Sequence, residues 1–155
     1  MIFGIYSHLN VLAFSYLKEG LITKKEIHIL PEKGLSAELP SLVAHFLNQD
    51  SPKCIALQRG PSGFTSLRVT LAYVQGLSLG WQSKLFTPTH FDLLKEHFNI
   101  QNGTIIIDHK GAILPGVVIK DTIQSTVKPF SKEDLNKDLV YTTDEQHALN
   151  LSTTL

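Results

Sequence analysis

The segment from Gly60 to Thr65 carries the residue types best suited to binding chemistry in this chain. Its residues are Gly60, Pro61, Ser62, Gly63, Phe64 and Thr65, and a helical pattern follows directly. Glycine reaches backbone angles that other residues avoid, and the first N–H groups of a helix are free to hold an anion. The segment therefore predicts either a phosphate-holding turn or a tight connection between a strand and a helix.

The other reactive side chains form no closely spaced set. The seven histidines are dispersed along the sequence, and none has the spacing of a metal-ligand pair. Cys54, the only cysteine, excludes an internal disulfide and begins an apolar run, which favours a core thiol over a nucleophile. Asp108 follows three isoleucines and is either a ligand at a strand end or the start of a turn. We predict no catalytic residues, no metal and no cofactor.

The predicted helix over residues 64–82 is unusual because it almost lacks charge. After Arg68 the next charged side chain is Lys84. Small residues recur at every fourth position, at Ala72, Gly76 and Gly80, and such a ridge permits close approach of another helix. A helix that is apolar nearly all round must be covered on both sides. The alternatives are a central helix buried in its own domain and a partner-binding helix, and in so short a chain we favour the second.

Hydropathy periods predict an α/β fold, with a mixed sheet and helices packed on it. The expected strands are 2–6, 11–17, 22–30, 54–57, 104–108, 113–119 and 139–141. The third strand alternates charged and apolar residues, which indicates a sheet edge. Helices are expected over 39–48, with Pro40 in the first turn, over 64–82 and from Thr87 onward. A helical turn at 131–134 and a loosely ordered tail after Asp144 complete the expectation.

The bulk composition limits the class of partner. The chain has 155 residues, with fourteen Lys plus Arg and fourteen Asp plus Glu. A balanced charge gives no broad electrostatic footprint for nucleic acid or for an anionic membrane. We expect neither a secretory signal nor a membrane span, because the first residues lack basic side chains and no apolar run is long enough. The sequence thus predicts a cytoplasmic protein.

The stretch from Gly60 to Gly80 resembles the Gly-Pro-Gly-Ser-Phe-Thr-Gly-Leu-Arg signature of the bacterial TsaB family, also called YeaZ. The third and fourth positions are exchanged, and the matching residues are Phe64, Thr65, Leu67 and Arg68. The resemblance covers about the first 120 positions. It includes Ile105-Ile106-Ile107-Asp108-His109-Lys110, where the family shows apolar residues followed by Asp-Ala-Arg.

This resemblance implies the ribonuclease-H-like fold of the actin-like ATPase superfamily. It implies an N-terminal lobe over residues 1–100, and a reduced second lobe with a flexible tail over 101–155. It also implies a non-catalytic scaffold in tRNA N6-threonylcarbamoyladenosine modification, which pairs with the TsaD transferase and with the ATPase TsaE and meets tRNA only indirectly. A homodimer is the alternative assembly.

In that family the pairing uses the first two helices of the N-terminal lobe. Carried over to this chain, the expected partner-binding residues are Leu42, Phe46, Phe64, Arg68, Ala72, Tyr73, Gln75, Gly76, Leu79 and Gly80. The partner is either a TsaD-like paralogue or a second copy of the chain.

The first strand departs from the family pattern. The family's first strand ends in Asp-Thr-Ser, and here the matching residues are Tyr6, Ser7 and His8. A tyrosine cannot replace a carboxylate beside magnesium, which argues against autonomous catalysis. Two alternatives stay open: a small ATP-dependent phosphotransferase or ATPase, with the Gly60 turn on phosphate and Asp108 on magnesium, and a degenerate relative that self-associates.

Overall fold

The structure, a computed structural model, describes residues 1–8, 10–31, 34–60, 63–101, 103–109, 112–119, 122–125 and 139–142. Beyond residue 101, side chains are described only at positions 105, 122 and 123. The elements in chain order are β1 Ile2–His8, β2 Val11–Lys18, β3 Leu21–Ile29, α1 Leu35–Leu47, β4 Cys54–Leu57, α2 Phe64–Trp81, β5 Lys84–Phe86, α3 His90–His97, β6 Gly103–His109, β7 Ala112–Ile119, β8 Thr122–Ser125 and β9 Leu139–Thr142.

The first sheet is mixed, as predicted. Its strand order is β3-β2-β1-β4-β5. The first three strands are antiparallel neighbours, whereas β4 runs parallel to β1, and β5 runs parallel to β4. The predicted edge position of the third strand is confirmed. Because side chains alternate along a strand, Phe3 and Ile5 of β1 face one side of this sheet and Tyr6 faces the other.

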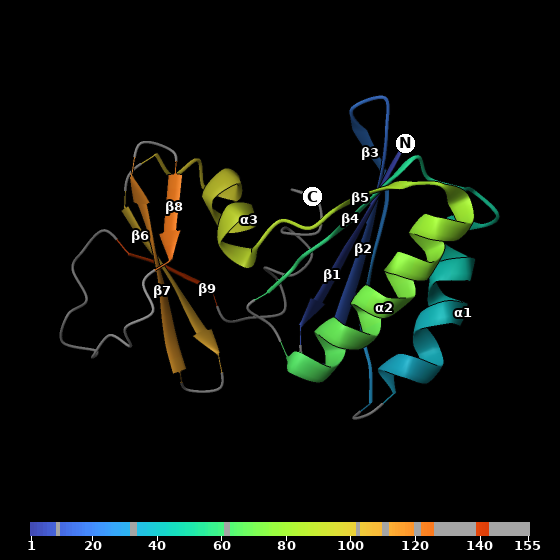
Figure 1. The fold of residues 1–155 in the computed structure, drawn as a ribbon, viewed down its shortest axis with the longest axis horizontal. Helices are drawn as coiled ribbons and strands as arrows, with labels where there is room; N and C mark the ends of the chain where they lie inside the picture. Colours follow the sequence, from blue (N-terminus) through green and yellow to red (C-terminus); the bar gives the residue numbers. More distant parts are fainter. Residues whose placement is uncertain are drawn as a thin grey trace.

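Helices α1 and α2 cover one face of the first sheet, side by side (Figure 1). Three phenylalanine rings lie at the centre of the core beneath them. The Phe3 ring centroid is 5.6 Å from those of Phe14 and Phe46, and the latter two are 5.2 Å apart. Helix α1 adds further large apolar side chains to this cluster, and α2 adds Val74.

The opposite face of the first sheet packs against α3 and the second sheet, whose strand order is β8-β7-β6-β9 (Figure 1). A second apolar cluster joins these parts. It contains Tyr6 and Ala13 from the first sheet, Leu94 from α3 and Ile105 from β6. The described helices include none that is long and apolar enough to cross a membrane.

Two features of the helices bear on the sequence predictions. Helix α1 begins at Leu35, four residues before the predicted start, so Pro40 lies in its second turn rather than its first. Proline has no N–H to donate to the carbonyl one turn earlier, and the helix tolerates this at an exposed position. Helix α3 is present as predicted but begins at His90, three residues after the predicted start. Thr89 caps it, because Asp92 N donates to Thr89 Oγ1 at 3.1 Å and Thr89 N donates to Asp92 Oδ2 at 2.7 Å.

Strands β5 and β8 are not predicted by the hydropathy pattern. Strand β5 has three residues, of which Lys84 and Phe86 are exposed, so it presents no apolar run. The predicted helical turn at 131–134 and the predicted loose tail after Asp144 lie outside the described residues.

Candidate functional site

Helix α2 faces the sheet with small side chains. Its buried residues are Ser66, Thr70 and Val74. Ser66 Oγ donates to the Gly63 carbonyl at 2.8 Å, and Thr70 Oγ1 donates to the Ser66 carbonyl at 2.8 Å. Because these hydroxyls are satisfied within the helix, they need no partner from the sheet. Small side chains also let the helix backbone lie close to the strands.

The opposite side of α2 is open to water. We call it the outer face of α2 and define it by its exposed residues Phe64, Thr65, Arg68, Ala72, Gln75, Gly76, Leu79 and Gly80. Phe64 is 72% exposed and Leu79 is 81% exposed. Arg68 carries the only charge on this face, and its guanidinium carbon lies 5.1 Å from the centre of the Phe64 ring. The sequence-predicted partner residues from Phe64 to Gly80 all lie on this face except Tyr73, which is half-buried beside it.

The small-residue ridge on this face is accessible. A Cβ atom built on Gly76 or Gly80 would have no heavy atom of the described chain within 4 Å, apart from its own helix backbone. These glycines are therefore not required for packing inside the described protein. Another backbone could approach α2 closely along Ala72, Gly76 and Gly80.

A shallow groove lies between α1 and α2. Its volume is about 280 Å³, and its lining includes Leu47, Asp50, Tyr73, Leu77 and Trp81. Burial raises the pKa of the Tyr73 phenol. The groove adds an aromatic recess to the border of the outer face of α2.

The two residues predicted on α1 differ in position. Leu42 is half-buried and packs on the edge of the core. Phe46 is only 2% exposed and stacks on Phe3 in the core, so it cannot reach a partner surface. We correct the prediction accordingly and exclude Phe46 from the candidate surface.

The glycine turn before α2 is only partly as predicted. Gly60 has φ of 116°, which strongly favours glycine. Gly63 has φ of −57° and ψ of 121°, angles that any residue adopts, so its expected special conformation is wrong. His90 N donates to the Gly60 carbonyl at 2.7 Å, which ties the turn to the start of α3. Pro61 and Ser62 lie outside the described residues.

A buried cluster of polar and aromatic side chains lies where β1 and β4 end. Ser7 and Gln58 are fully buried, and Tyr6 and His90 are each 4% exposed. The Tyr6 and His90 rings meet edge-on with centroids 5.5 Å apart, and the His8 ring is 6.2 Å from that of His90. Sheets of this kind bind ligands at such carboxyl ends. The sequence analysis missed Gln58 and His90 as neighbours, because no short-range pattern joins them to β1.

Tyr6 occupies the position where the TsaB family shows aspartate. Its side chain lies in the apolar cluster under α3, and burial raises its pKa well above the ordinary value. The phenol is therefore neutral at physiological pH. It supplies packing at this position and no negative charge for a metal ion.

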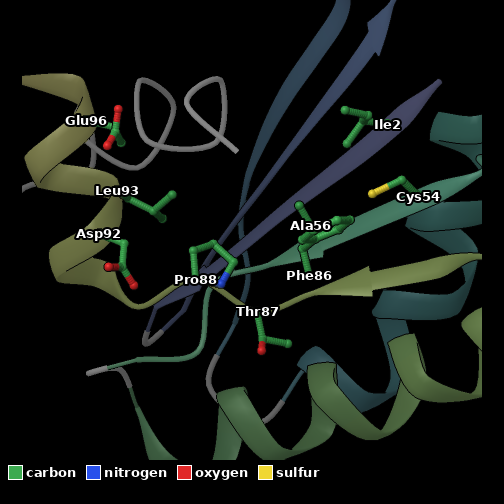
Figure 2. A pocket seen from close by; sticks show the side chains of 9 residues that line it. All are labelled: Ile2, Cys54, Ala56, Phe86, Thr87, Pro88, Asp92, Leu93 and Glu96. Atoms are coloured by element: carbon green, nitrogen blue, oxygen red, sulfur yellow. The ribbon is translucent and has the colours of Figure 1, made fainter.

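Figure 2 shows a pocket on the opposite face of the first sheet from α1 and α2. Its volume is about 520 Å³. Its lining comes from three strands, the segment after β5, and α3, and consists of Ile2, Cys54, Ala56, Phe86, Thr87, Pro88, Asp92, Leu93 and Glu96. Cys54 is half-buried there, and burial raises the pKa of its thiol. A raised thiol pKa disfavours the thiolate. The predicted core position of Cys54 is not observed, because its side chain is half-buried and lines this pocket.

Asp108 lies in β6, opposite Ile113 of β7. Its side chain is outside the described set, so its predicted role at a strand end stays a prediction.

The sequence matches no family model and no curated protein. Solved structures resemble it in fold. An uncharacterized protein with similarity to peptidase YEAZ, from Pseudomonas aeruginosa, has a TM-score of 0.65 at 17% identity, over 87% of this chain and 68% of that one. YeaZ from Pseudomonas aeruginosa has a TM-score of 0.62 at 18% identity, over 83% of this chain and 65% of that one. This chain thus spans about two thirds of the length of either protein.

A more distant match is the putative N-acetylglucosamine kinase from Porphyromonas gingivalis. Its TM-score is 0.59 at 11% identity, over 82% of this chain and 47% of that one. The two Pseudomonas structures agree with the TsaB-like signature after β4, and at these identities the likeness establishes the fold. The chain therefore has a ribonuclease-H-like α/β fold, similar to that of the two Pseudomonas structures.

Proposed function

We propose that this chain is a non-catalytic, TsaB-like scaffold subunit that binds a protein partner through the outer face of α2. The observation that carries the proposal is the exposure of this face. Phe64 and Leu79 are large apolar side chains that stand in water on an 18-residue helix whose only charge is Arg68. An exposed helix face that carries a single charge and large apolar side chains favours contact with a partner over permanent exposure to water.

The shape of the face suits another helix. Ala72, Gly76 and Gly80 form a shallow ridge, and Phe64 and Leu79 project near its two ends. Helices with small residues at the contact pack at short interaxial distances. Arg68 is positioned to meet a carboxylate of the partner, since aromatic and arginine side chains are frequent anchors in interfaces.

The non-catalytic part of the proposal is supported by β1. Where the resembled TsaB family shows aspartate at the end of the first strand, this chain has the buried, neutral Tyr6. Magnesium prefers oxygen ligands that include a carboxylate, and Tyr6 has none.

The identity of the partner follows from the resemblance. A TsaD-like paralogue is the proposed partner, with a TsaE-like ATPase joining the assembly and tRNA meeting this subunit only indirectly. The balanced charge of the chain supports an indirect role, because a large direct tRNA surface would require an excess of basic residues.

The test is co-purification with the TsaD-like protein of the same organism. Gly76→Glu places a charged side chain where the partner backbone would approach, and we expect affinity to fall at least ~30-fold, about 2 kcal/mol. His97→Glu on α3 is the matched control, because it adds the same charge at an exposed helical position on the other side of the sheet. Equal binding by the Gly76→Glu variant and the parent chain would overturn the proposed interface.

Calorimetric titration with magnesium ATP tests the non-catalytic assignment separately. We expect no heat of binding from the isolated chain. Tight binding would replace the scaffold proposal with the phosphotransferase alternative.

A further inference from the structure

The pocket between α3 and the first sheet has the size and lining of a small-molecule site. Ligand pockets usually occupy ~300–1,000 Å³ and are mostly apolar with a few polar groups. This pocket, of about 520 Å³, lies within that range. Its floor is hollow because Cys54 and Ala56 are small and lie between the larger Ile2 and Phe86 (Figure 2).

The register of the sheet explains the floor. Ile2 pairs with Cys54 across β1 and β4, and Ala56 pairs with Phe86 across β4 and β5. Residues paired in this way, and those two apart on one strand, point to the same face. The two small side chains therefore lie on β4, in the middle of the floor. The larger side chains on β1 and β5 border it.

The charged groups lie on the α3 side. Asp92 and Glu96 are one helical turn apart on the pocket wall, with Leu93 between them (Figure 2). Asp92 Oδ2 accepts from Thr89 N and Thr89 Oγ1, so the α3 cap holds this carboxylate in place. Glu96 is 67% exposed and pairs with Lys95 at 3.1 Å. The described lining contains these two carboxylates and no basic side chain.

The end of the pocket near Cys54 is positively charged, unlike the end formed by α3. Lys84 pairs with Cys54 across β4 and β5. Burial raises the pKa of the Cys54 thiol, and the positive charges of the N-terminal ammonium and of Lys84 act in the opposite direction. A ligand with one cationic group would therefore place that group toward α3, away from Lys84. Its apolar body would lie on Ala56 and against Phe86 and Leu93.

We propose that this pocket binds a small amphipathic amine, with an aromatic or aliphatic body on the floor and its ammonium group toward Asp92 and Glu96. The apolar lining supplies the contact area, and the carboxylates supply the preference for a cation over an anion of the same shape. This site is independent of the outer face of α2, from which the sheet separates it.

Cys54 makes the proposal directly testable, because it is the only cysteine of the chain and it lines the pocket. The rate at which a neutral thiol reagent labels Cys54 in the full chain reports occupancy of the pocket. The probes are 2-phenylethylamine, 3-phenylpropionate and 3-phenylpropanol, which share an apolar body and differ in charge. We expect 2-phenylethylamine to slow labelling at concentrations at least about fivefold lower than the other two require.

Two variants test separately the contribution of the carboxylate charge and the contribution of the apolar cavity to binding. Glu96→Gln removes one carboxylate at an exposed position, and we expect the preference for the amine to fall about threefold, whereas Glu38→Gln on α1 is the matched control and leaves it unchanged. Ala56→Leu fills the floor and should abolish protection by all three probes, with circular dichroism confirming the fold. Equal protection by amine and carboxylate, or no protection at all, would refute the proposed ligand class.

Discussion

Helices α1 and α2 lie side by side on one face of the same sheet, yet they are built in opposite ways. The buried residues of α1 are all large and apolar, namely Leu39, Val43, Phe46 and Leu47. Those of α2 are Ser66, Thr70 and Val74, of which two carry hydroxyls. The outward residues reverse this pattern, because α1 exposes Glu38, Ser41 and His45, whereas α2 exposes Phe64 and Leu79.

The difference shows how two tasks are divided between neighbouring helices. Burial of apolar area is the main stabilising contribution in a small domain, and here α1 provides more of it than α2. The fully buried side chains of α2 are short, and its larger residues Val69, Leu71, Tyr73, Leu77 and Trp81 are only partly buried at the border of the core. Phe64 and Leu79 remain at the surface. A helix with large apolar side chains on its exposed face is expected where a second macromolecule covers that face.

The largest expected effect comes from removing one apolar side chain from each helix. Phe46→Ala should lower the free energy of unfolding by about 3–5 kcal/mol, because Phe46 is buried against Phe3 and Phe14. Leu79→Ala should change it by less than about 0.5 kcal/mol, because Leu79 is 81% exposed. Urea denaturation followed by circular dichroism measures both. Similar losses in the two variants would contradict the division of tasks between α1 and α2.

A smaller effect is expected from adding one methyl group to a glycine of each helix. A Cβ on Gly34, at the start of α1, would lie 2.9 Å from Pro31 Cγ, so Gly34→Ala should cost about 1–3 kcal/mol. A Cβ on Gly76 meets no described atom within 4 Å, so Gly76→Ala should stabilise the isolated chain by about 1 kcal/mol through helix propensity. Thermal unfolding distinguishes these opposite signs. Destabilisation by Gly76→Ala would mean that the ridge of α2 is already covered in the free protein.

Much of this contrast is readable from the sequence. The lack of charge between Arg68 and Lys84 predicts a helix without a charged face, and the observed helix begins at the predicted residue. The spacing of Ala72, Gly76 and Gly80 also predicts one shared side, and all three are exposed. These predictions succeed because they depend on local periodicity alone.

The wrong assignment of Phe46 concerns the apolar stripe of α1, which could pack on the sheet or contact a partner. Residues 39, 42, 43, 46 and 47 share one face of α1, and the sequence analysis assigned part of that face to a partner. Because this stripe packs on the sheet, it cannot also contact a partner, and Phe46 lies in the core. The resemblance to a family whose first two helices bind a partner produced this assignment, since the periodicity itself favours core packing.

The polar cluster of Tyr6, Gln58 and His90 was not predictable for a different reason. These residues come from β1, the end of β4 and the start of α3, and only the parallel pairing of β1 with β4 brings them together. Apolar periodicity predicts the strands but not their order in the sheet. The glycine turn and its bond to His90 are likewise set by this tertiary arrangement.

The smallest expected effect concerns two tyrosines and the openness of the groove between α1 and α2. Burial raises the pKa of both Tyr6 and Tyr73, and the shift of Tyr6 is the larger. A raised pKa means that the folded state resists ionisation of the phenol. The contribution of each tyrosine to stability is therefore complete below the unfolded pKa of about 10 and is lost as pH rises above it.

The measurement is the free energy of unfolding in urea from neutral pH to pH about 11. Tyr6→Phe should make the alkaline loss of stability distinctly shallower than in the parent chain, because the most strongly shifted phenol is gone. Tyr73→Phe should change the slope only slightly, because Tyr73 remains half-buried in a groove that water reaches. If the two variants flatten the curve equally, the groove is closed in solution, and the border of the outer face of α2 is not available to a partner without rearrangement.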